Sequence, residues 1–199
     1  MAGRARIGVL ALQGDVREHT SALSELDVDV TKVRTAADLS AIDGLVLPGG
    51  ESSVIDKLSR TFGVADPIRR AIARGLPVFG TCAGLIMLSE RLVDGIDGQH
   101  TFGGLDVTVQ RNAFGSQTDS FETDLDIPEL GERPVHAVFI RAPVVTDVGP
   151  EVRVLSQIGT GRIVAVEQGN VMATSFHPEV SGERRFHERF VEGVRSRMG

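Results

Sequence analysis

Cys82 is the only cysteine of this 199-residue chain, and its neighbours suit a nucleophile. The apolar residues 78–79 predict a buried strand, residues 80–84 read Gly-Thr-Cys-Ala-Gly, and the apolar residues 85–88 open a helix. This is the Gly-x-nucleophile-x-Gly pattern of a sharp strand–turn–helix elbow, with cysteine in the serine position. Small flanking residues allow the bend, and a helix N-terminus favours the thiolate. For the elbow alone, a buried structural cysteine remains the alternative.

A histidine and a carboxylate near the C-terminus are the groups that a thiol nucleophile needs. Residues 173–179 read Ala-Thr-Ser-Phe-His-Pro-Glu and follow an apolar strand. Because Pro178 keeps His177 extended, Glu179 points the same way as His177 or reaches a ring nitrogen after a small bend. We expect a triad in which His177 takes the proton of Cys82 and returns it to the leaving group. A surface His-Pro turn is the alternative for the tripeptide alone.

A glycine pair offers backbone donors that complete this chemistry. Residues 44–53 read Gly-Leu-Val-Leu-Pro-Gly-Gly-Glu-Ser-Ser, a strand followed by a turn and a helix that Ser52 or Ser53 caps. The N–H groups of Gly49 and Gly50 are open to approach and suit an oxyanion hole. By itself the pair is equally consistent with an ordinary tight turn.

Together and in this order, the three motifs resemble those of the class I (triad) glutamine amidotransferases. Further segments are similar to the glutaminase subunits of pyridoxal 5'-phosphate synthase: residues 8–19, Gln-Arg-Asn-Ala-Phe-Gly at 110–115 and Phe-Ile-Arg-Ala-Pro at 139–143. The matching blocks spread from residue 8 to residue 187. Residues 93–103 look like a variable loop that touches no motif, and the first six residues are a short extension.

The resemblance implies that the chain hydrolyses L-glutamine to L-glutamate and ammonia through a glutamyl thioester on Cys82. It implies catalytic roles for Cys82, His177 and Glu179, and oxyanion donors at Gly50 and Ala83. Arg111 then clamps the substrate α-carboxylate through paired hydrogen bonds, and Ile140 and Arg141 supply backbone groups. The full set of implied substrate contacts is Gly50, Glu51, Ser52, Arg111, Ile140 and Arg141.

The resemblance also implies a partner, a separate synthase subunit with a barrel fold that uses the ammonia to build pyridoxal 5'-phosphate. Residues 13–19 follow the first strand and carry polar and charged side chains, so we expect them to dock this subunit. No cofactor is implied. No pair of histidines has metal-ligand spacing together with Cys82, so no metal is expected.

Length and composition predict one domain spanning residues 1–199. The length and the apolar fraction of 41% suit a single globular core. A net charge of −6 argues against nucleic acid as the partner, and no apolar stretch is long enough for a membrane span. A lone cysteine, with no signal segment before it, fits the reducing cytoplasm.

Strands and helices alternate in the first half of the chain, which predicts a mixed, mostly parallel sheet with helices on both faces. The active groups then lie at the carboxyl ends of strands. We expect strands at 7–12, 28–33, 45–47, 105–110, 135–140, 152–157, 163–167 and 171–175. We expect helices at 15–26, 51–60, 67–74 and 181–197. Hairpin turns are expected at 159–161 and 168–170.

The remaining histidines have weaker functional signals. His19 is expected on the surface of the first helix or against a partner, and His100 in the variable loop. His136 opens a strand and is expected to be structural, whereas His187 is expected on the polar side of the last helix.

Two other functions share some of these motifs. A cysteine peptidase or stress-response hydrolase on a similar scaffold also uses an elbow cysteine, but the Pro-Gly-Gly-Glu-Ser segment and Arg111 favour the amidotransferase. A binding module that only regulates a partner would not need the intact set of Cys82, His177 and Glu179.

Overall fold

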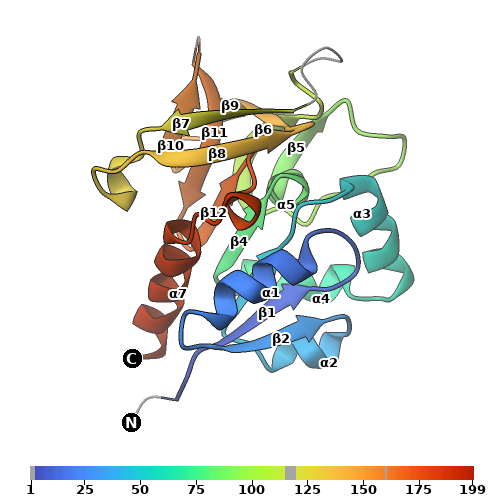
Figure 1. Ribbon diagram of the computed structural model, residues 1–199. Coiled ribbons are helices and arrows are strands. Elements are labelled where there is room, and N and C mark those ends of the chain that lie inside the picture. The colour runs from blue at the N-terminus through green and yellow to red at the C-terminus, as the bar shows by residue number, and fades with distance from the viewer. Residues whose placement is uncertain (1–2, 115–119, 160) are drawn as a thin grey trace.

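The computed structural model describes residues 3–114, 120–159 and 161–199, which form one α/β domain around a ten-stranded sheet (Figure 1). The sheet order is β2-β1-β3-β4-β12-β11-β9-β6-β5, and β10 pairs with β11 beside this path. A separate hairpin, β7 with β8, lies over one face of the sheet.

The half of the sheet that carries the site is parallel. Its strands are β2 (Asp29–Val33), β1 (Arg6–Leu10), β3 (Gly44–Leu47), β4 (Val78–Thr81) and β12 (Val171–Thr174). Every residue of β3, β4 and β12 is buried, because helices cover both faces. Strands of this kind are continuously apolar rather than alternating, as their sequences show. Their carboxyl ends meet at one edge of the sheet.

The other half of the sheet is mostly antiparallel. It contains β11 (Arg162–Gln168), β10 (Arg153–Ile158), β9 (Val144–Val148) and β6 (Leu105–Gln110), with β5 (Ser89–Val93) parallel to β6 at the edge. The hairpin joins β7 (Ser120–Leu125) to β8 (Val135–Ile140), with a short 3₁₀ turn, η1 (Pro128–Leu130), between them. The predicted fold class, a mixed α/β sheet flanked by helices, is confirmed.

Two hydrophobic cores lie on the two faces of the sheet. One face packs against α2 (Ala36–Ser40), α3 (Ser52–Thr61), α4 (Ala65–Ala73) and α5 (Ala83–Leu88). The other face packs against α1 (Val16–Ser24), α7 (Arg185–Met198) and the β7–β8 hairpin. In Figure 1, α1 and α7 stand on the same side of the sheet, although one is near the start of the chain and the other at its end. None of the described helices is both long and apolar enough to cross a bilayer.

Several sequence-based boundaries were wrong. The helix expected at 181–197 begins later, as α7 at Arg185, because a short helix, α6 (Pro178–Ser181), precedes it and ends at Gly182 in the left-handed conformation. The first helix is shorter than expected, and Leu26 lies outside it. Strands β5, β7 and β9 were not expected, since β5 and β7 are largely exposed and rich in polar residues. In the expected turn at 159–161, Thr160 lies outside the described residues, but the strands on either side pair antiparallel.

Candidate active site

Cys82 lies in a strained turn directly after β4, where α5 begins. Its backbone has φ 48° and ψ −101°, a conformation that L-residues rarely adopt. The flanking glycines allow close packing: a Cβ on Gly84 would lie 2.2 Å from the carbonyl oxygen of Leu47, and one on Gly80 2.7 Å from the carbonyl carbon of Gly84. The turn therefore presents the thiol at the carboxyl end of β4 and at the N-terminus of α5.

His177 follows β12, the strand next to β4 in the parallel half, so the two strand ends bring it close to Cys82. The residue is the N-cap of α6, with Pro178 in the first helical position, and its backbone N–H donates to the carbonyl of Val138 over 2.9 Å. The ring lies against Gly49, where a Cβ would come within 2.4 Å of its Cε1 atom. His177 and Cys82 line the same cavity.

Two carboxylates face the Nδ1 atom of His177. Oε1 of Glu179 lies 2.9 Å from it and Oδ2 of Asp15 lies 3.2 Å from it. Burial lowers the pKa of His177, but hydrogen bonds with Asp15, Cys82 and Glu179 outweigh burial and raise that pKa above its ordinary value. The imidazole is therefore well suited to accept the proton of the thiol.

Glu179 is held as an ion in a fully buried position. Its Oε1 atom accepts from Nδ1 of His177 and, over 3.0 Å, from the hydroxyl of Thr81. Nε2 of His19 lies 3.3 Å away. Burial raises the pKa of Glu179, but His19 and then His177 hold it well below the usual range. A carboxylate in this state fixes the imidazole and stabilises its charged form.

The cavity above Cys82 has a volume of about 230 Å³. One wall carries the ion pair between Arg111 and Glu51, which are 2.7 Å apart. Gln99 accepts from Arg111 over 3.2 Å and donates to the hydroxyl of Ser52 over 3.0 Å. Ile140 closes another side, its carbonyl 3.9 Å from the sulfur of Cys82. The cavity thus has a nucleophile at its base and charges of both signs at its wall.

The structure brings most of the expected site residues into this cavity. Those that line it are Gly50, Glu51, Ser52, Cys82, Arg111, Ile140, Arg141 and His177. Glu179 lies behind His177, and Ala83 is buried in the first turn of α5. The expectation that Ser52 or Ser53 caps α3 was wrong, because the N-cap is Glu51, which accepts from the N–H of Ser53.

Three further residues of the site were not singled out in the sequence. Asp15 and Thr81 contact the triad, and Gln99 contacts Arg111. Thr81 is the residue before the nucleophile, and Asp15 lies in the segment that follows β1, so both are at the sheet edge that holds the site. Gln99 lies in the loop at 93–103, which was expected to touch no motif; that expectation was wrong.

The backbone around Gly49 and Gly50 is held by the segment before α1. The N–H of Asp15 donates to the carbonyl of Gly49 over 3.0 Å, and the N–H of Glu51 donates to Oε1 of Gln13 over 2.7 Å. Gly50 has φ 149°, and a Cβ there would lie 2.3 Å from the same Gln13 oxygen. The segment at 13–15 therefore sets the direction of the peptide groups beside Cys82.

The positions of two histidines contradict the sequence-based expectation. His19 and His187 are both fully buried, and their rings are hydrogen-bonded to each other over 2.9 Å. His19 is not available to a partner, and His187 does not lie on the polar side of α7. His136 is exposed, between Asp124 and Glu122, and His100 is also exposed.

Among the described residues, one group of side chains has metal-ligand chemistry: Asp15, His177 and Glu179, whose ligand atoms lie within 4.8 Å of one another. Their separations of 2.9 and 3.2 Å are those of hydrogen bonds to one imidazole N–H. The absence of a metal remains a prediction, which unchanged glutaminase activity after dialysis against a chelator would support.

Comparison with known proteins extends over the whole chain. The SNO glutamine amidotransferase family matches residues 9–196. A protein of Leifsonia xyli described as pyridoxal 5'-phosphate synthase subunit PdxT is 62% identical, with 100% of each chain covered. A protein of Streptomyces avermitilis with the same description is 54% identical, over 96% of this chain and 94% of its own.

Solved structures agree with this fold. A crystal structure described as a glutamine amidotransferase superposes with a TM-score of 0.87 at 46% identity, covering 94% of this chain and 98% of its own. The structure of PurLQS from Thermotoga maritima has a TM-score of 0.66 at 18% identity, covering 99% of this chain and 100% of its own, and shows the shared fold alone.

Proposed function

This chain belongs to the SNO glutamine amidotransferase family, and from this premise we propose that it hydrolyses L-glutamine to L-glutamate and ammonia for pyridoxal 5'-phosphate synthesis. The observation that carries the proposal is the arrangement at the base of the cavity. Cys82 and His177 line the same small space, and Glu179 is hydrogen-bonded to His177 from behind. A nucleophile, a base and an orienting carboxylate are the groups that amide cleavage requires.

The reaction begins when the Cys82 thiolate attacks the side-chain amide carbon. The carbonyl oxygen becomes an oxyanion, and the N–H groups of Gly50 and Ala83 are its proposed donors. Collapse breaks the C–N bond, and the imidazolium of His177 protonates the leaving nitrogen, which departs as ammonia. Water then loses a proton to His177 and attacks the thioester, so that glutamate leaves and the thiolate is restored.

The walls of the cavity suit a free amino acid. Arg111 is placed to bind the α-carboxylate in paired hydrogen bonds, in exchange for its present partner Glu51. The freed carboxylate of Glu51 then faces the α-ammonium group. The carbonyl of Ile140, close to the sulfur, is a suitable acceptor for the amide NH₂ of the substrate. A volume of about 230 Å³ favours a single amino acid over the extended peptide that a cysteine peptidase binds.

The test is glutamate release from L-glutamine by the wild-type chain and by Cys82→Ala. We expect the alanine variant to lose release completely and to keep its fold, which circular dichroism checks. A glutamine analogue with an electrophilic side chain should label Cys82 alone. Cleavage of peptides without release from free glutamine would favour the peptidase, and activity in Cys82→Ala would exclude the triad.

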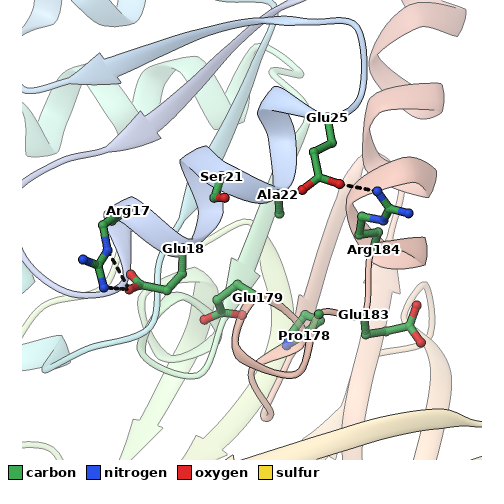
Figure 2. A pocket seen from close by; sticks show the side chains of 10 residues that line it. Arg17, Glu18, Ser21, Ala22, Glu25, Pro178, Glu179, Glu183 and Arg184 are labelled. Carbon is green, nitrogen blue, oxygen red and sulfur yellow. Dashed lines mark hydrogen bonds and ion pairs between the residues drawn. The ribbon is translucent and has the colours of Figure 1, made fainter.

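We propose a synthase subunit with a barrel fold as the partner, docked at residues 13–19, in the cytoplasm, where a catalytic thiol stays reduced. The side chain of Arg17 is 93% exposed and bonded to Glu18. Both residues line a groove of about 640 Å³ between α1 and the segment 178–184, which contains α6 and the turn before α7. Figure 2 shows the Arg17–Glu18 pair at one end of this groove and the Glu25–Arg184 pair at the other.

The same segment supports a coupling between docking and activity. Its inner residues, Gln13 and Asp15, bond the backbone on both sides of Gly50. A partner that moves this segment therefore changes the direction of the oxyanion donors. We expect weak glutaminase activity of the chain alone and a marked rise when the synthase subunit binds.

A further inference from the structure

A buried network of polar side chains lies behind the triad, on the side away from the substrate. Its members are His19 of α1, Thr81 at the end of β4 and His187 of α7, and all three are fully buried. Nε2 of His19 lies 3.0 Å from the Thr81 hydroxyl, and Nδ1 of His19 lies 2.9 Å from Nε2 of His187. The mechanism above gives none of them a role.

The direction of the hydrogen bonds follows from the hydroxyl of Thr81. A threonine hydroxyl has one proton to donate and two lone pairs that accept. Its proton goes to Oε1 of Glu179 over 3.0 Å, and one lone pair accepts from the N–H of Gly49 over 3.1 Å. Nε2 of His19 must therefore carry a proton, because Thr81 has none left to give. This N–H donates to the second lone pair of Thr81. The same Nε2 atom also lies 3.3 Å from Oε1 of Glu179.

The other ring nitrogen of His19 is held by His187. Burial, and then the proximity of His19, lowers the pKa of His187 to about 3, so His187 is neutral near pH 7. The hydrogen bond between Nε2 of His187 and Nδ1 of His19 therefore holds the ring of His19 with its Nε2 towards Thr81. Both rings also pack edge-on against Phe79, which limits their rotation.

We propose that His19 is a positioning residue for glutamine hydrolysis, which holds Glu179 in place for His177 both directly and by orienting the Thr81 hydroxyl. This inference rests on the proposed glutaminase function. Oε1 of Glu179 receives donors from three elements, α1, β4 and the turn into α6, whereas Oε2 has no partner among the described residues. With only one oxygen anchored, the carboxylate depends on all of these donors to stay aimed at the imidazole.

The test compares three variants of His19 and its helix. His19→Leu removes the donor and introduces an apolar side chain that fills part of the same space, whereas His19→Gln keeps a donor close to the position of Nε2. Leu23→Ala, on the same face of α1 and fully buried, is the matched control for a loss of packing without contact to Glu179. Glutamate release is measured with the synthase subunit present, and thermal unfolding is measured for each variant.

We expect His19→Leu to lower kcat about 10-fold to 100-fold, the effect of losing one or two hydrogen bonds to a buried charge, with little change in KM. His19→Gln should recover most of kcat. Leu23→Ala should lower the unfolding temperature at least as much as His19→Leu and keep kcat. In a Glu179→Gln background, His19→Leu should cost far less, because its effect passes through the carboxylate. Equal losses in both backgrounds, or equal kcat losses in His19→Leu and Leu23→Ala, would overturn the proposal.

A second measurement does not depend on glutamine. Cys82 is the only thiol, so its alkylation by iodoacetamide at pH 7 reports how well the triad maintains the thiolate. We expect slower alkylation in His19→Leu than in wild type and Leu23→Ala, and recovery in His19→Gln. Wild-type rates in His19→Leu would contradict the positioning role. If wild type releases no glutamate even with the synthase subunit, the glutaminase function is excluded. Slower alkylation of His19→Leu than of wild type would then still support the role of His19 in positioning the triad.

Discussion

Cys82 shows how a single residue combines strain with reactivity. The positive φ that lifts the thiol into the cavity is unfavourable for any side chain, and the packing of Gly80 and Gly84 on both sides holds it there. The nucleophile is therefore in a position that function requires and that stability opposes.

This strain predicts an unusual order of stability. Relative to Cys82→Ala, Cys82→Gly should raise the free energy of unfolding by about 1 kcal/mol, because glycine adopts the positive φ without strain. Urea unfolding of the two variants measures the difference. The control is Ala22→Gly, in the middle of α1. Relative to wild type, this change should lower the free energy of unfolding by about 1 kcal/mol. If Cys82→Gly is less stable than Cys82→Ala, the backbone of the elbow is not strained.

His177 and Glu179 should differ in how much each contributes to turnover. His177→Asn should remove nearly all turnover, a loss of about 10⁴-fold, because it deletes the group that transfers the proton. Glu179→Gln should lose less, since the carboxylate orients the imidazole and carries no proton itself. Steady-state kinetics at saturating glutamine compares them. A greater loss in Glu179→Gln than in His177→Asn would reverse the roles.

At the scale of elements, α1 is more than a cover for the sheet. Asp15, at its start, and His19, one turn later, lie on the same face and reach His177 and Glu179 from one side. Its opposite face carries Arg17 and lines the groove of Figure 2. One short helix therefore connects a surface to the buried end of the triad.

The loop at 93–103 also acts on the site, through Gln99. Gln99→Ala should raise KM for glutamine about fivefold, the equivalent of one hydrogen bond of ~1 kcal/mol, because Arg111 and Ser52 lose a common partner. The kcat value should stay close to wild type. Asp97→Ala, an exposed change in the same loop, is the control and should leave both constants unchanged. A fall in kcat without a change in KM would place Gln99 elsewhere in the reaction.

The motifs predicted the position of the site because each follows a short, continuously apolar strand of the parallel half. Strand ends at Leu47, Thr81 and Thr174 are recognisable in the sequence, and parallel strands bring such ends together. The contacts between helices were not predictable in this way. Periodicity does place His19 on the face of Leu23, and His187 on that of Phe190 and Val194. A polar residue on an apolar face is a signal of burial, but it does not reveal its partner.

For the whole molecule, the buried side chain of His187 makes stability depend on pH. The folded pKa of His187, about 3, lies below the ordinary value of 6.5, so the unfolded chain binds the proton first. The stabilisation is complete above about pH 6.5 and is lost as the pH falls towards the folded pKa. At pH 5 the loss from this residue amounts to about 2 kcal/mol.

Thermal unfolding between pH 7 and pH 4.5 tests this dependence. The wild-type unfolding temperature should fall with decreasing pH. His187→Leu should start lower at pH 7, because it loses the bond to His19, and then decline less steeply. His100→Leu is the control, since the side chain of His100 is exposed, and its decline should remain as steep as that of wild type. Parallel curves for wild type and His187→Leu would mean that His187 is protonated in the folded state.

The partner should act from the surface that carries Arg17. Arg17→Glu should weaken the activation by the synthase subunit, since it places two like charges at one end of the groove, while the basal rate and the unfolding temperature stay the same. Lys57→Glu, a charge reversal at an exposed position on α3, is the control. Measuring glutamate release at increasing concentrations of the synthase subunit gives the basal rate and the strength of the activation. Equal activity of the isolated wild-type chain and the complex would contradict the coupling itself.

The hydrogen bond between His19 and His187 joins positions 168 residues apart, so it can form only late in the synthesis of the chain. During synthesis on the ribosome, the thiol, the imidazole and the carboxylate all emerge before His187. The support behind the carboxylate is absent until α7 has been made and has folded back against α1. Chains that have not yet been translated through α7 therefore lack the full triad geometry, and the release of ammonia is reserved for chains in which α7 has been made.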